Sequence, residues 1–107
     1  QHKIVFSSSE KNGYSVSVYD PEENRSELVL TIPAKKGYFA HFAVEEGKMY
    51  FVVGPANKKK INTVQVYFIH VGKKKAEQIK GVDDAFYKKL MESSADPYKI
   101  ELKTSNL

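Results

Sequence analysis

Residues 47–71 constrain the fold more than any other part of the chain. This stretch, GKMYFVVGPANKKKINTVQVYFIHV, contains an apolar run, a lysine-rich loop and a second apolar run with alternating character. Alternation with a period of two is typical of a β-strand, whose successive side chains point to opposite faces of a sheet. We therefore predict two antiparallel strands, residues 48–53 and 62–71. Both faces of the second strand are apolar, which predicts a central position in its sheet.

Five further runs indicate additional short antiparallel strands. Turn-forming residues separate them, such as Asn12-Gly13, a pair that favours a tight turn. In the third run Leu28, Leu30 and Ile32 are expected on one face. The expected strands cover residues 3–8, 14–19, 27–32, 38–44, 48–53, 62–71 and 76–80, the last as a short edge strand.

Alternation also predicts which side chains are buried together. We expect one face of the second strand to carry Tyr14, Val16 and Val18, and the buried face of the fourth to carry Tyr38, Ala40, Phe42 and Val44. The strand over residues 62–71 should carry Val64, Val66, Phe68 and His70 on one face and Tyr67, Ile69 and Val71 on the other.

After residue 81 the apolar period changes to between three and four residues. Val82, Phe86 and Leu90 recur at helical spacing, and a pair of aspartates precedes them, where a helix N-terminus favours negative charge. We predict one amphipathic helix over residues 83–94. Residues 98–107 are expected to form a last strand or a tail.

Composition agrees with one globular domain over residues 1–107. Hydrophobic residues make up 41% of the chain and charged residues 28%, which are ordinary values for a folded domain. The chain has no cysteine, which excludes disulfides and thiolate chemistry, and it has no apolar run long enough for a membrane-spanning helix. The expected fold class is mostly β (α+β): an antiparallel barrel or sandwich of about seven short strands with one C-terminal amphipathic helix.

The chain contains an internal echo. KIVF at residues 3–6 followed by VSVY at 16–19 is matched by KMYF at 48–51 followed by VQVY at 64–67. A spacing near 45 residues predicts two β units in tandem, residues 3–47 and 48–80.

The second unit resembles a kelch repeat over GKMY at 47–50, VG at 53–54 and INTVQVY at 61–67, and YDPEEN at 19–24 adds to the likeness in the first unit. The resemblance covers residues 3–76. Val53-Gly54 stands where kelch repeats carry a Gly-Gly pair, and Ser26 and Lys75 stand near the tryptophan positions. Two such units cannot close a propeller. The resemblance therefore implies either self-association into a ring or a fragment of a longer kelch-like propeller.

The order of elements also resembles a pleckstrin-homology-like barrel, in which seven antiparallel strands are followed by one helix. That resemblance implies that the helix closes one end of the barrel and buries Val82, Phe86 and Leu90 there.

Catalytic chemistry has little support in the sequence. The three histidines, His2, His41 and His70, have no metal-binding spacing, and no glycine-rich phosphate loop or nucleophile elbow occurs. Asp20 and His70 take comparable places in the two units, but no particular serine completes a triad with them. We expect a non-enzymatic protein with no catalytic residue, metal or cofactor.

Lysine clusters are the clearest candidate binding residues. The chain carries a net charge of +4, and Arg25 is the only arginine among its 17 basic residues. The clusters lie in expected loops and consist of Lys35 and Lys36, of Lys58, Lys59 and Lys60, and of Lys73, Lys74 and Lys75. The last two clusters should lie at opposite ends of one strand. Clustered lysines can attract anions, but they also solubilise turns and protect sheet edges.

Two classes of function follow from these patterns. The first is a protein-binding or interaction module that uses a β surface and can self-associate. The second is an anion-recognition domain, for phosphoinositide headgroups in a membrane or for nucleic acid, acting through the lysine loops. The sequence leaves the compartment open.

Overall fold

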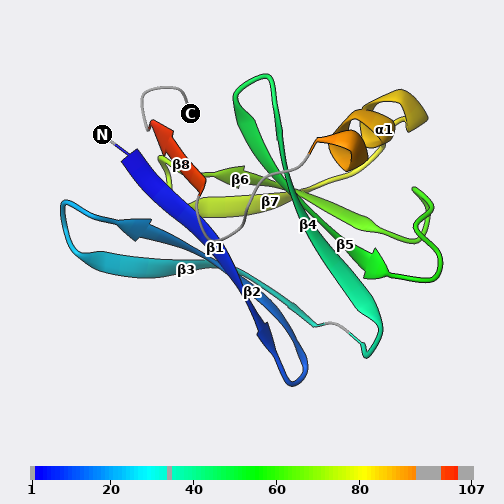
Figure 1. The fold of residues 1–107 in the computed structure, drawn as a ribbon, viewed down its shortest axis with the longest axis horizontal. Helices are drawn as coiled ribbons and strands as arrows, with labels where there is room; N and C mark the ends of the chain where they lie inside the picture. Colours follow the sequence, from blue (N-terminus) through cyan, green and yellow to red (C-terminus); the bar gives the residue numbers. More distant parts are fainter. Residues whose placement is uncertain (1, 34, 94–99, 104–107) are drawn as a thin grey trace.

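The computed structural model of the chain describes residues 2–33, 35–93 and 100–103. Seven strands precede one helix, and a short strand follows it (Figure 1). The elements are β1 (His2–Glu10), β2 (Gly13–Asp20), β3 (Arg25–Pro33), β4 (Tyr38–Glu45), β5 (Lys48–Pro55), β6 (Gln65–His70), β7 (Lys75–Ile79), α1 (Asp84–Glu92) and β8 (Ile100–Lys103). This composition confirms the mostly β class and the C-terminal helix.

The strands form two antiparallel sheets that pack face to face as a sandwich. The first sheet has the order β3-β2-β1-β8 and the second has the order β4-β5-β6-β7. A two-residue turn at Glu46 and Gly47, both with positive φ, pairs β4 with β5. The break between the sheets therefore lies between β3 and β4, whereas the sequence echo places the boundary of the two units at residue 47.

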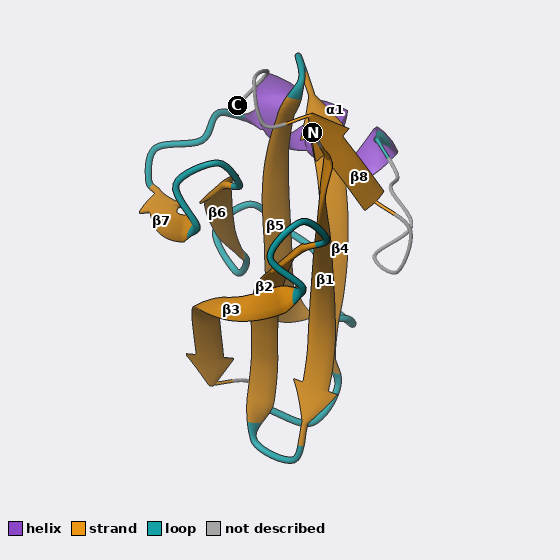
Figure 2. Ribbon diagram, turned by 90° about the vertical axis from the view of Figure 1, so that its left-hand side faces the viewer, coloured by secondary structure: helices purple, strands orange, loops and turns teal. Residues whose placement is uncertain are grey.

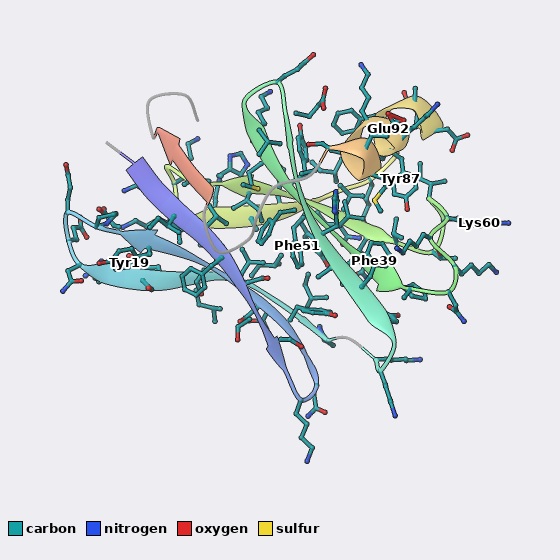
Figure 3. All side chains as sticks on the ribbon, in the orientation of Figure 1. Tyr19, Phe39, Phe51, Lys60, Tyr87 and Glu92 are labelled. Atoms are coloured by element: carbon teal, nitrogen blue, oxygen red, sulfur yellow. The ribbon has the colours of Figure 1, made fainter. Side chains whose placement is uncertain are left out.

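The main hydrophobic core lies between the sheets, and Phe51 is at its centre (Figure 3). It consists of Val5, Val16, Val18, Ile32, Phe42, Met49, Phe51, Val53, Ile69 and Val71. The faces predicted for β2 and β6 are confirmed. Those predicted for β4 are confirmed except at Ala40, which is exposed near the strand's beginning.

The helix packs on the outer face of the second sheet. A second cluster of buried residues there consists of Ala43, Val52, Val66 and Leu90. Two hydrogen-bonded contacts fix the end of α1 on β4: His41 Nε2 lies 2.9 Å from the Leu90 carbonyl oxygen, and Ser93 Oγ donates to the Val44 carbonyl at 2.9 Å. The helix therefore forms a third layer, instead of closing the end of a barrel as the pleckstrin-homology-like resemblance implies. Figure 2 shows α1 at the end of the molecule opposite to the β1–β2 turn.

Strand β6 begins at Gln65, three residues later than predicted, because residues 61–63 form a turn. The hydroxyl of Thr63 donates to carbonyl oxygens of the preceding loop, which fixes that turn.

The prediction that Leu28 shares a face with Leu30 and Ile32 is wrong. The register steps from Val16↔Leu30 to Ser17↔Leu28, so Val29 is an extra residue at a β-bulge. A bulge reverses the alternation of faces along its strand. Leu28 consequently points away from the core.

Candidate interaction surface

The side of the first sheet that faces away from the core is a distinctive surface, here called the outer face. Its side chains follow from the strand register and from the bulge in β3. At the edge of the sheet, β8 pairs Glu101 with Ile4 and Lys103 with His2. The described side chains that β1, β2 and β3 contribute to the outer face are Ile4, Phe6, Ser8, Ser15, Ser17, Tyr19, Ser26, Leu28 and Thr31. None of these side chains carries a charge, in a chain that is 28% charged. Depletion of charge is characteristic of the centre of protein interfaces.

Apolar residues on the outer face are not packed into either core. Leu28 is 64% exposed, and Ile4 and Phe6 are partly exposed and belong to neither hydrophobic cluster. Phe6, Ser17 and Leu28 lie side by side on neighbouring strands. The small serine between the two large side chains leaves room for a group from outside.

The cluster of Lys58, Lys59 and Lys60 lies in the loop between β5 and β6, and Lys60 points away from the molecule (Figure 3). The Lys59 Nζ atom lies 4.9 Å from the centre of the Phe39 ring. The backbone carbonyl of Lys59 accepts a hydrogen bond from the Tyr87 hydroxyl at 2.9 Å. This loop is thereby held against the helix side of the second sheet.

The cluster of Lys73, Lys74 and Lys75 lies at the other end of β6, as predicted. Lys74 is not free to bind an anion, since its Nζ atom lies 3.5 Å from Glu27 Oε1 and 3.9 Å from Glu23 Oε2. The pKa of Glu27 is lowered by its hydrogen bond from Arg25 and further by Lys74. Lys74 therefore ties the β6–β7 turn to β3 across the two sheets.

The pair Lys35 and Lys36 lines a cavity of about 310 Å³ together with Lys11, a lysine outside the three predicted clusters. Lys11 lies in the β1–β2 turn, 24 residues away in sequence, so only the fold brings it to Lys35. No described acidic side chain lines this cavity. The Ala56 N–H donates a hydrogen bond to the Gly37 carbonyl at 2.8 Å, which joins the start of the β5–β6 loop to the turn before β4. The loop that carries Lys58, Lys59 and Lys60 therefore begins beside the turn that carries Lys35 and Lys36, and then runs toward α1.

The described histidines and buried carboxylates have structural partners. His70 Nε2 lies 2.9 Å from Glu77 Oε1, and this hydrogen bond lowers the pKa of Glu77. Asp20, which is buried, accepts a hydrogen bond from Lys3 Nζ at 2.8 Å, and this bond lowers the pKa of Asp20.

A cavity of about 670 Å³ lies between the loop before β6, strand β7 and the start of α1. Asp83 lines this cavity, and its carboxylate caps α1 by accepting a hydrogen bond from the Phe86 N–H at 2.8 Å. The residues that line it include no histidine, serine, threonine or tyrosine.

Among the described residues, no group of three or more histidine, aspartate or glutamate side chains could hold a metal ion. The helix in the described part of the chain is too short and too polar to cross a membrane. No protein-family model matches the chain, and no curated protein or solved structure matches it significantly.

Proposed function

We propose that this protein is a non-enzymatic interaction module that binds protein through the outer face of its first sheet. This proposal depends on one observation: the described side chains of β1, β2 and β3 on this face are uncharged, and they include Leu28, which is 64% exposed and aligned with Phe6 across Ser17. An exposed leucine by itself is ordinary, but an uncharged area across three strands that also exposes apolar side chains is typical of a binding surface. The outer side of the second sheet differs, because α1 packs on it and the exposed, charged Glu77 lies beside Phe68 there.

Binding of an uncharged, environment-sensitive dye to the folded protein at high dilution tests this proposal. A neutral dye avoids attraction to the lysines. We expect its fluorescence to rise with the wild-type protein and to fall by at least about half with Leu28→Lys, since a buried leucine contributes about 1.5–3 kcal/mol of transfer free energy.

Gln78→Lys is the matched control, because it adds the same charge at an exposed position of β7. Leu28→Lys should keep the wild-type midpoint temperature of unfolding (Tm), since Leu28 makes no core contact. Equal dye fluorescence with the two variants would refute the proposed surface.

A second function, anion recognition, is supported by the cavity that joins Lys11 to Lys35 and Lys36. Lysines that converge from separate loops can bind phosphate or sulfate groups through charge-assisted hydrogen bonds. The ligand class would be a polyanion, such as nucleic acid or a phosphoinositide headgroup.

Retention on immobilised heparin tests the anion function. Replacing Lys11, Lys35 and Lys36 by glutamine should lower the salt concentration at which the protein elutes, because each lost phosphate-type contact reduces the dependence on salt. The control replaces Lys73, Lys75 and Lys88 by glutamine, which removes the same charge elsewhere. Elution of both variants at the same salt concentration would show that only net charge acts.

A further inference from the structure

The two sheets repeat one arrangement of strands. Strands β2 and β3 are joined by a four-residue turn between Asp20 and Arg25, and β6 and β7 by a four-residue turn between His70 and Lys75. The last turn residue has a positive φ in both, 51° at Asn24 and 53° at Lys74. Left-handed backbone at non-glycine residues is uncommon, so its recurrence at the same turn position marks the hairpins as equivalent.

The equivalence extends to whole sheets. β8 pairs with β1 as β4 pairs with β5, so β8-β1-β2-β3 corresponds to β4-β5-β6-β7. The echo of 45 residues then places Ile4 at the position of Met49 and Phe6 at the position of Phe51. Met49 and Phe51 are fully buried, and the first sheet is what covers them.

The repeat therefore shows what kind of group suits the outer face. Ile4 and Phe6 lie on the outer face of the first sheet. The equivalent face of the second sheet, which carries Met49 and Phe51, is covered by another β-sheet. The opposite face of the second sheet, at the position where a further sheet would follow, is covered by α1 instead. The layers run sheet, sheet, helix, and the helix closes only one end of this stack.

We infer that the outer face of the first sheet packs against the same face of a second copy of this chain, related by a twofold axis. This inference rests on the proposed function of that face. A twofold contact brings each residue type near itself, which is unfavourable for like charges, and the described side chains of the outer face carry none. In the second copy α1 packs on the outer side of the other sheet, so the outer face of the first sheet is the more accessible of the two.

The size of the face sets the strength of the contact. Three strands ~4.8 Å apart and ~8 residues long at ~3.3 Å per residue offer roughly 400 Å² in projection on each copy. This is at the small end for specific interfaces, which typically bury ~800 Å² per partner. The dimer should therefore form reversibly and depend on protein concentration.

Sedimentation equilibrium over a range of protein concentrations tests the inference on the full chain. The average mass of the wild type should rise from 12.2 kDa, the mass of one chain, toward twice that value. Leu28→Lys should remain at the single-chain mass over the same range, because a twofold contact would bring two lysines together. Gln78→Lys should associate like the wild type, and a shared far-ultraviolet circular dichroism spectrum would show that both variants are folded.

A wild type that stays monomeric at the highest concentration would overturn the second copy as the partner. It would leave the proposed binding face intact if the neutral dye still distinguishes Leu28→Lys from Gln78→Lys. Equal dimerisation of the two variants would place the dimer contact elsewhere and would overturn the inference as well.

Discussion

At the scale of single residues, Leu28 shows how a local irregularity creates a surface. The run Leu28-Val29-Leu30 is apolar at three consecutive positions, so its pattern is compatible with either phase of alternation. Only the pairing of β3 with β2 shows that Val29 is the extra residue of a bulge. The sequence could therefore predict the strand but not the exposed position of Leu28, on which the proposed binding face depends.

A second residue, Asp20, makes stability depend on pH. Its carboxylate is buried and accepts hydrogen bonds from the Lys3 ammonium at 2.8 Å and from the Glu22 N–H at 3.0 Å. These hydrogen bonds, led by the one from Lys3, lower the pKa of Asp20 in the folded chain. Because the folded pKa is below the unfolded one, the stabilisation is complete above about pH 4 and is lost as pH falls through the folded pKa.

We therefore expect Asp20→Asn to lower Tm at neutral pH, and the difference in Tm from the wild type to shrink as the pH is lowered below about 4. Thermal unfolding followed by circular dichroism at several pH values measures this difference. Glu22→Gln removes a carboxylate from an exposed neighbouring position and should change Tm little. A constant Tm difference for Asp20→Asn across acidic pH would contradict the assigned ion pair.

At the scale of elements, periodicity predicts what a segment is but not where it packs. Alternation predicts the faces of β2 and β6 correctly because, in each of these strands, one face packs in the core between the sheets and the other face does not. The helix likewise follows from the spacing of Val82, Phe86 and Leu90. Its apolar stripe fits either the end of a barrel or the face of a sheet, and long-range contacts such as that of His41 with the Leu90 carbonyl decide between them.

The lysine loops show the same limit. Their position in turns follows from the Gly and Pro residues beside them, and the separation of Lys58–Lys60 from Lys73–Lys75 follows from the strand between them. The pairing of Lys74 with Glu27 and the approach of Lys11 to Lys35 join segments from different hairpins. Such pairings depend on how the two sheets stack, which periodicity along one strand does not encode.

At the scale of the whole molecule, the repeat and the helix together govern assembly. In a propeller, each blade packs on two neighbours, so a kelch-like ring needs two open sheet faces in each two-sheet unit. Here α1 covers one such face, and the open outer face of the first sheet is the other. A chain with one open face forms a closed dimer, whereas a chain with two different open faces can add copies without limit.

The helix should therefore limit association to the dimer, and Leu90→Ala tests this. Leu90 is fully buried between α1 and the second sheet, and truncating a buried leucine to alanine typically costs about 2–5 kcal/mol. Loosening α1 makes the outer side of the second sheet available to the first-sheet outer face of another copy. We expect light scattering to report species larger than a dimer for Leu90→Ala, increasing with concentration.

Adding Leu28→Lys to Leu90→Ala separates this head-to-tail association from aggregation of unfolded chains. If copies stack through folded sheets, a charge on the outer face should remove the large species while the β-sheet circular dichroism signal is retained. Unfolded chains would aggregate whether or not residue 28 is a lysine, so large species that persist in the double variant would contradict the role of α1. Lys88→Ala, on the exposed side of the same helix, should leave the wild-type mass distribution unchanged, because Lys88 is exposed and does not belong to the cluster between α1 and the sheet.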